Sequence, residues 1–146
     1  MGSAMHTNRL NSRIQKENFY PQAISGFSHN NKIYGVPRDI SNLVLYINLD
    51  KIPLPKESWT IEELYKLAKV ATTEKTFGIG CEEDIYWATP YLTYFGGGIL
   101  DSNSELIINS KESQIGLNFY HDLINKNKLA PKKSQIGSST LAQMFL

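Results

Sequence analysis

The sequence is poor in the residues that build disulfides and metal sites. It has one cysteine, Cys81, so no disulfide can form within the chain. Its three histidines lie far apart, and no cysteine or carboxylate accompanies them at metal-ligand spacing. We therefore expect no metal and no cofactor. Cys81 is interpreted as a small core residue, and the histidines are interpreted as surface residues: His6, His29 and His121.

An excess of charge of either sign is also missing. Fifteen Lys and Arg are balanced by fourteen Asp and Glu, which gives a net charge of +1. The basic residues form no stripe with aromatic residues, so we expect no nucleic-acid partner. No apolar run is long enough to cross a membrane, and residues 1–13 lack the apolar region of a signal peptide. We interpret residues 1–13 as disordered or tag-like.

The familiar enzyme motifs are absent too. The sequence contains no G-x-S-x-G elbow, no H-E-x-x-H and no P-loop. Three consecutive glycines, residues 96–98, follow a predicted helix instead of preceding one, so they are read as a stop signal and not as a phosphate cradle.

What is present fits a globular chain of 146 residues, with 41% hydrophobic and 20% charged residues. Residues 31–50 hold two apolar runs, 33–36 and 43–48, which are predicted strands. The polar turn between them carries Arg38, Asp39, Ser41 and Asn42. Such a turn gathers hydrogen-bonding side chains as a small-molecule site requires, although an ordinary hairpin loop has the same pattern.

Local signals predict three helices. The first covers residues 60–72, where Thr60 and Glu63 form a capping box. The second covers residues 87–95, with Pro90 in its first turn, and the third covers residues 111–128 behind a Ser110 cap.

Other signals are shorter. Residues 77–81 predict a strand, and residues 99–109 predict a hairpin around residues 101–104. Ser138 or Ser139 could cap one more helix.

An acidic turn beside two aromatic residues is the most suggestive cluster. Glu83 and Asp84 stand next to Tyr86 and Trp87. Proteins hold sugars by stacking a ring face on an aromatic side chain while a carboxylate accepts bonds from the hydroxyls. The alternatives are a solvated acidic turn followed by core aromatics, and a glycosidase in which Asp39 supplies the second carboxylate.

Three stretches of the sequence resemble sequences of a known protein family. The stretches N-K-I-Y-G-V-P, L-V-L-Y-I-N and E-S-W-T-I-E-E-L resemble the region where bacterial extracellular solute-binding proteins of the maltose-binding type (family 1) cross from their first lobe to their second. The departures are Asn31 where glycine is common, Ile47 where tyrosine is common and Leu49 in place of lysine.

The resemblance implies an α/β fold of the periplasmic-binding-protein-like type II. The chain would be a truncated fragment, mainly part of the second lobe plus the crossover segment. The implied divisions are residues 14–37 for the end of the first lobe, 38–50 for the crossover or hinge and 43–146 for a partial second lobe. Strands 43–48 and 77–81 would form a sheet, with helices 60–72 and 111–128 on its faces.

The resemblance also implies a function. Matching Pro90 and the glycine pair to the family pattern puts Asp84 on a sugar-binding acid, and Tyr86 and Trp87 on stacking aromatics. The full set of expected ligand-binding residues is Arg38, Asp39, Ser41, Glu83, Asp84, Tyr86 and Trp87. The parent protein would be a periplasmic or cell-surface subunit of an ABC importer that binds a carbohydrate, contacts permease subunits and catalyses nothing. A glycoside-processing enzyme, a lectin-like module and a plain interaction domain remain the alternatives.

Overall fold

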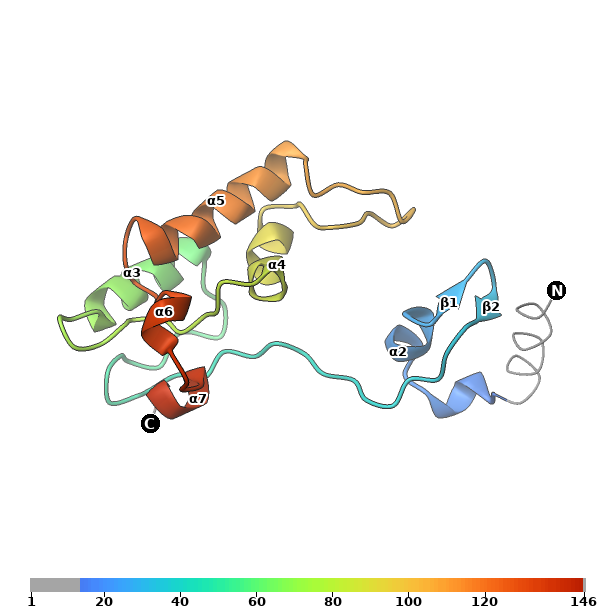
Figure 1. Cartoon of the computed structure of the whole chain (residues 1–146), viewed down its shortest axis with the longest axis horizontal. Coiled ribbons are helices and arrows are strands. Elements are labelled where there is room, and N and C mark those ends of the chain that lie inside the picture. Colours follow the sequence, from blue (N-terminus) through green and yellow to red (C-terminus); the bar gives the residue numbers. More distant parts are fainter. Residues whose placement is uncertain (1–13, 146) are drawn as a thin grey trace. The chain divides into compact units, whose positions relative to one another are not determined.

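The structure, a computed structural model, describes residues 14–145. The chain divides into two compact units, Met1–Tyr46 and Ile47–Leu146. The predicted tag-like segment 1–13 and His6 lie outside the described residues. The helices and strands follow in this order (Figure 1): η1 Lys16–Asn18, α2 Pro21–Ser25, β1 Ser28–His29, β2 Lys32–Ile33, α3 Ile61–Ala71, α4 Ile85–Tyr94, α5 Lys111–Asn125, α6 Lys133–Ile136 and α7 Leu141–Phe145.

The first unit contains a small hairpin. Strands β1 and β2 pair antiparallel, with Ser28 opposite Ile33 and His29 opposite Lys32. Asn30 and Asn31 form the turn with φ of 48° and 61°, a left-handed backbone that asparagine tolerates and that suits a tight hairpin. The predicted strand over residues 33–36 is therefore wrong beyond Ile33, because strand β1 offers a partner to only two residues.

The predicted sheet of strands 43–48 and 77–81 is also wrong in detail. Neither stretch is a strand in the described residues. Within residues 14–145, residues 35–45 form no backbone hydrogen bond, and the amide of Ile79 donates to the Leu129 carbonyl at 3.1 Å without continuing into a ladder. A run of apolar and β-branched residues indicates that the side chains would fit a sheet. It forms a strand only where a neighbouring strand pairs with its backbone.

Helix α3 forms as its end signals predict. The amide of Glu63 donates to Oγ1 of Thr60 at 3.3 Å, and the amide of Thr60 donates to Oε2 of Glu63 at 2.8 Å. This capping box satisfies two backbone donors that the first turn leaves free. The prediction of a helix over residues 60–72 is confirmed.

Helix α4 begins two residues earlier than predicted, at Ile85 instead of Trp87. Asp84 is its N-cap, because the backbone at Asp84 is extended and its side chain accepts the amide of Tyr86. Pro90 consequently lies inside the helix and not in its first turn. Gly96, with φ of 82°, ends the helix, and the Gly97 amide donates to the Leu92 carbonyl at 2.9 Å, as the glycine stop signal predicts.

Helix α5 confirms its predicted cap, because Oγ of Ser110 accepts the amide of Ser113 at 3.1 Å. The helix ends at Asn125, earlier than the predicted Lys128. The predicted hairpin over residues 99–109 is reduced to one bridge between Leu100 and Leu106.

The last helix has a different cap from the one predicted. Neither Ser138 nor Ser139 caps α7; Oγ1 of Thr140 accepts the amide of Gln143 at 3.2 Å, and Oε1 of Gln143 accepts the amide of Thr140 at 2.8 Å.

The core of the second unit lies between α3, α4 and α5. Leu92, Leu123 and Ile124 are 0 to 2% exposed, and Cys81 is 2% exposed, as the sequence predicts for a core cysteine. The aromatic rings of Tyr91, Phe95, Phe119 and Tyr120 pack together with centroids 5.5 to 5.9 Å apart. Burial of these apolar side chains is the main force that holds the helices together.

Gly116 permits the close approach of α5 to α4. A Cβ at Gly116 would lie 2.7 Å from Cα of Leu92, so the replacement Gly116→Ala must push the two helices apart. We expect Gly116→Ala to lower the free energy of unfolding by about 1–3 kcal/mol, although alanine is the better helix former. Urea unfolding measures this change.

Gly80→Ala is the matched control. A Cβ at Gly80 would meet Cδ2 of Leu141 at 3.6 Å, an ordinary contact, so the unfolding free energy should change little. Equal effects of the two replacements would contradict the close packing of α4 on α5.

Candidate functional site

Four of the seven predicted binding residues lie at the start of α4: Glu83, Asp84, Tyr86 and Trp87. Oδ1 of Asp84 accepts the amide of Tyr86 at 2.8 Å, so the carboxylate caps the helix at the positive end of its dipole. Oδ2 of Asp84 has no hydrogen bond within residues 14–145. The exposed carboxylate can therefore accept one more hydrogen bond from a ligand while it continues to cap the helix.

Tyr86 and Trp87 differ in their surroundings. Tyr86 is 51% exposed, whereas Trp87 is half-buried and packs against the core of the second unit. Their rings meet edge to face, with centroids 6.4 Å apart and an interplanar angle of 85°. Tyr86 thus presents an open aromatic surface, and Trp87 supports it from the core side.

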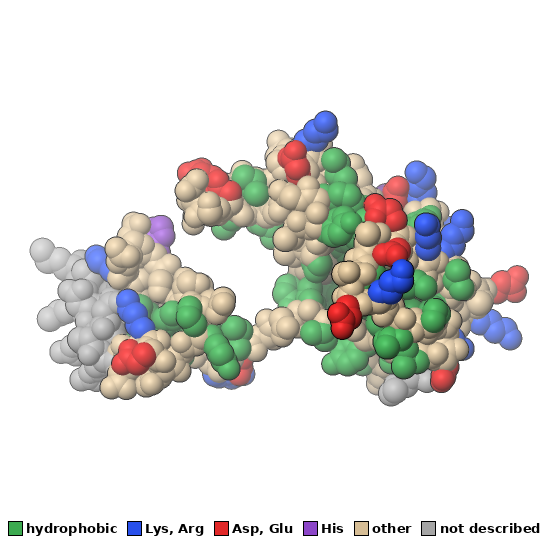
Figure 2. All heavy atoms as spheres, turned by 180° about the vertical axis from the view of Figure 1, so that it is seen from behind, with side chains coloured by type: hydrophobic (Ala, Val, Ile, Leu, Met, Phe, Trp, Pro, Cys, Tyr) green, Lys and Arg blue, Asp and Glu red, His purple; other side chains and the backbone are tan. Residues whose placement is uncertain are grey.

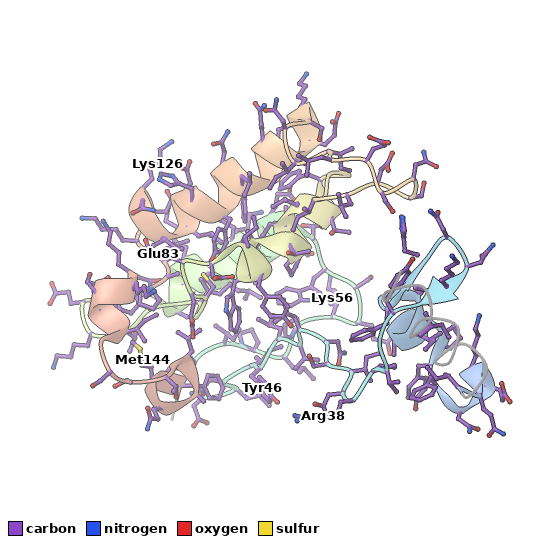
Figure 3. All side chains as sticks on the ribbon, turned by 45° about the vertical axis from the view of Figure 1, so that its right-hand side comes forward. Arg38, Tyr46, Lys56, Glu83, Lys126 and Met144 are labelled. Atoms are coloured by element: carbon purple, nitrogen blue, oxygen red, sulfur yellow. The ribbon has the colours of Figure 1, made fainter. Side chains whose placement is uncertain are left out.

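Glu83 has a structural contact of its own. Its Oε2 accepts the backbone amide of Lys133, the first residue of α6, at 3.0 Å. The side chain is labelled in Figure 3. The bond links the start of α4 to the start of α6, two segments that are 50 residues apart in sequence.

A groove of about 420 Å³ runs beside this site between α4 and α5. Its size falls within the range of small-molecule sites. Acids from the start of α4 and polar residues from α5 surround an apolar floor; the lining residues are Glu83, Asp84, Ile85, Ala88, Leu117, Asn118, Tyr120, His121, Ile124 and Asn125.

The groove divides the predicted cluster. Glu83 and Asp84 line it, but Tyr86 and Trp87 do not. A helix turns by about 100° per residue, so Ile85 and Ala88 face α5 while the two aromatic residues between them face elsewhere. Asp84, at the tip of the helix, is the residue that borders both surfaces.

The other three predicted residues belong to the first unit. Nε of Arg38 and Oδ2 of Asp39 form an ion pair of 2.7 Å, and their side chains are 93% and 71% exposed. Ser41 is exposed as well. An exposed pair of this kind adds little to stability, so both side chains can exchange their contact for a ligand. Their part in the site stays a prediction.

The α5 residues of the groove were missed by the sequence analysis. Asn118, His121 and Asn125 follow one another at helical spacing, but such spacing also describes a solvated helix face. Only the packing of α5 on α4 brings them beside Glu83 and Asp84. His121 is exposed, as predicted, and its Nδ1 lies 3.4 Å from Oδ1 of Asp122.

Three buried side chains of the core, Cys81, Tyr91 and Tyr120, carry groups that can lose a proton, and Tyr120 also lines the groove. Burial raises the pKa of the Cys81 thiol to about 12 from 9.0. Burial also raises the pKa values of Tyr91 and Tyr120, with the neighbouring Cys81 thiolate as the next cause. The Tyr120 hydroxyl has no hydrogen-bond partner of good geometry in the described part of the chain.

Residues 14–145 contain no cluster of three or more His, Cys, Asp or Glu side chains that could hold a metal ion. None of the described helices is long and apolar enough to cross a membrane.

Comparisons with known proteins identify the fold. No protein-family model matches the chain, and no curated protein matches it. Among solved structures, the chain is similar to the ABC substrate-binding protein Lmo0181 from Listeria monocytogenes in complex with cycloalternan, with a TM-score of 0.70 and 18% sequence identity. The match covers 99% of this chain and 39% of that chain, so this chain spans about two fifths of its length.

The similarity confirms the predicted fold class. The chain has the fold of part of a substrate-binding protein, rich in helices and with few strands. The matched protein is named as a substrate-binding protein, the class of protein that the sequence resembles.

The buried thiol of Cys81 leads to a prediction about pH. Its pKa is raised to about 12 in the folded chain, so between pH 9.0 and about 12 the unfolded chain loses a proton that the folded chain keeps. The free energy of unfolding should therefore fall with rising pH in this window, by at most about 1.4 kcal/mol per pH unit from this group. Urea unfolding at several pH values measures the slope.

The variant Cys81→Ala removes the thiol and should make this slope shallower, while Tyr91 and Tyr120 still contribute at the higher end. An unchanged slope in the variant would show that the thiol does not ionise differently in the two states.

Proposed function

We propose that this chain is part of the carbohydrate-binding subunit of an ABC transporter, as its resemblance to the maltose-binding type implies. The observation that supports the proposal most is an exposed acid and an open aromatic ring, Asp84 and Tyr86, side by side at the start of α4 in a substrate-binding-protein fold. The matched structure carries cycloalternan, a carbohydrate, which fits this reading. Such a subunit captures its ligand and breaks no bond.

In this proposal Tyr86 stacks against the apolar face of a sugar ring. The ring is 51% exposed and is backed by Trp87, so it offers a rigid surface that loses little side-chain freedom on binding. Oδ2 of Asp84 accepts a hydrogen bond from a hydroxyl of the same sugar. Glu83 lines the groove, and its carboxylate can accept a further hydrogen bond from that side.

Arg38, Asp39 and Ser41 would contribute from the crossover. Arg38 donates and Asp39 accepts hydrogen bonds, and all three side chains are exposed in the first unit. In the proposed parent protein, two hinged lobes close over the ligand, and permease subunits respond to the closed form. The proposed location of the parent is the periplasm or the cell surface.

A cleft that buries 70 to 90% of a ligand takes contacts from both lobes. The chain spans 39% of the matched protein, so we expect weak binding, on the order of millimolar, from the contacts that it can supply.

The replacement Asp84→Asn separates the charge of Asp84 from its role as a helix cap. Asparagine caps helices as well as aspartate does, so Asp84→Asn should change the unfolding free energy by less than about 0.5 kcal/mol. The loss of the carboxylate should weaken the binding of cycloalternan at least several-fold, because an acceptor with charge makes the stronger bond. Calorimetric titration measures the affinity, and urea unfolding measures the stability.

Glu82→Gln is the matched control, because Glu82 is exposed, lies two residues before Asp84 and does not line the groove. It should leave the affinity unchanged. Equal losses of affinity in both variants would show that general surface charge, and not the Asp84 carboxylate, causes the loss. Product formation from chromogenic glycosides by the unaltered chain would favour the enzyme reading instead.

The replacement Tyr86→Ala tests the exposed ring of Tyr86. Tyr86→Ala should weaken carbohydrate binding about two- to twelvefold, since stacking on an aromatic ring is worth about 0.5–1.5 kcal/mol, and should cost little stability because the ring is exposed. Tyr20→Ala removes a ring that is 70% exposed in the first unit and should leave the affinity unchanged. Trp87→Ala is a poorer probe, because Trp87 packs on the core. An unaltered affinity in Tyr86→Ala would remove this ring from the site.

A further inference from the structure

A hydrogen bond between two distant segments restrains the turn that precedes α4. Oε2 of Glu83 accepts the backbone amide of Lys133 at 3.0 Å, and Lys133 is the first residue of α6. The two residues are 50 positions apart in sequence, and both belong to the second unit. The bond therefore restrains the segment before α4 from outside that segment.

Helix α6 has a donor at its start that no local cap satisfies. The first amides of a helix have no partner inside the helix. The N-cap residue, Lys132, has a side chain that cannot accept a hydrogen bond. Glu83 supplies the acceptor for the amide of Lys133 instead. The bond is of the stronger, charge-assisted kind, because its acceptor is a carboxylate.

The chain just before Lys133 is firmly anchored. Residues 129–131 are each at most 4% exposed. The amide of Ile79 donates to the carbonyl of Leu129 at 3.1 Å, and the amide of Leu129 donates to the carbonyl of Leu123 at 2.8 Å. Because this buried segment is held from two sides, the amide of Lys133, two residues further on, is a fixed point for Glu83.

The turn that Glu83 belongs to has few side-chain contacts. Glu83 is its central residue, because the amide of Asp84 donates to the carbonyl of Glu82 at 2.8 Å. None of these three side chains is part of the core of the second unit. Within residues 14–145, the side chain of Glu82 makes no hydrogen bond, and that of Asp84 bonds only the amide of Tyr86. The bond to Lys133 is thus the side-chain contact that ties this turn to the rest of the unit.

The orientation of this turn sets the position of the Asp84 carboxylate. Asp84 has an extended backbone, with φ of −144° and ψ of 147°, and its Oδ1 accepts the Tyr86 amide at 2.8 Å. A rotation of the backbone at Glu83 would move Asp84 relative to the helix that it caps. It would also move Oδ2, the oxygen that the proposed function assigns to a sugar hydroxyl.

We propose that the backbone amide of Lys133 is a positioning group of the ligand site. Through Glu83 it holds the turn at residues 82–84, and it thereby places the carboxylate of Asp84 for a carbohydrate hydroxyl. Lys133 itself touches no ligand. The inference rests on the proposed function, and it adds the start of α6 to the groups on which that function depends.

The replacement Lys133→Pro removes this one donor. Proline has no N–H, and its fixed φ suits the first position of a helix. Lys132 already has the extended backbone that a residue before proline requires, with φ of −73° and ψ of 157°. Lys133→Pro should weaken the binding of cycloalternan about two- to twelvefold, the range for one lost hydrogen bond. Calorimetric titration measures the affinity, and circular dichroism confirms that the helices are kept.

Lys133→Ala is the matched control, because it removes the side chain and its charge but keeps the amide. Figure 2 shows acidic and basic side chains interspersed on the face of the second unit that it draws, so the loss of one lysine leaves a surface of mixed charge. The affinity should therefore fall by less than about twofold. Equal losses of affinity in the two variants would overturn the proposal, because the side chain and not the amide would then matter.

The amide of Tyr86 reports the position of the carboxylate without any ligand. It donates to Oδ1 of Asp84, so its proton chemical shift in NMR spectra depends on where that oxygen lies. The shift should change in Lys133→Pro and not in Lys133→Ala. An unchanged shift in Lys133→Pro would overturn the proposal. A changed shift in a chain that binds no cycloalternan would contradict the proposed function and still support the positioning of Asp84 by Lys133.

The double variant with Glu83→Ala and Lys133→Pro tests whether the two groups act through one bond. Both single replacements break the same hydrogen bond, so the double variant should show the Tyr86 shift of either single variant. Additive changes would overturn the proposal, because the two groups would then act independently. Glu83→Gln keeps an oxygen that accepts the Lys133 amide, and it should recover most of the original shift. A glutamine variant that behaves as Glu83→Ala would overturn the role of this hydrogen bond.

Discussion

The close packing of α5 on α4 is the constraint on which the second unit depends. Gly116 allows the two backbones to meet, because a side chain there would collide with Leu92. The rings of Tyr91, Phe119 and Tyr120 fill the space around this crossing. The groove is lined by side chains from the start of α4 and from α5, so it depends on the packing of these two helices.

Backbone amides hold two acidic side chains at the start of α4. Asp84 caps α4 through Oδ1, and Glu83 accepts the first amide of α6. Both carboxylates are therefore held in place by backbone groups before any ligand arrives. A site whose acceptors are positioned by the fold loses less freedom when it binds, which is an advantage for a receptor that must recognise a polar ligand.

The aromatic pair at the start of α4 shows how exposure separates a candidate binding residue from a core residue. Trp87 packs on the core and supports Tyr86, which keeps half of its surface open. An open aromatic ring next to an acid that the backbone holds in place suits the apolar face and the hydroxyls of a sugar.

The sequence by itself determined the helices, because their signals act between residues that are close along the chain. Thr60 and Glu63, Ser110 and Ser113, and Thr93 and Gly96 are three residues apart, and each contact forms as the residue types predict. Asp84 as the cap of α4 was missed because three acids in a row offer the same chemistry, and only the backbone at Asp84 selects one. Tertiary structure alone decided the rest. The strands predicted at 43–48 and 77–81 needed partners from distant parts of the chain, and the groove beside Glu83 and Asp84 forms only because α5, more than twenty residues further along the chain, packs on α4.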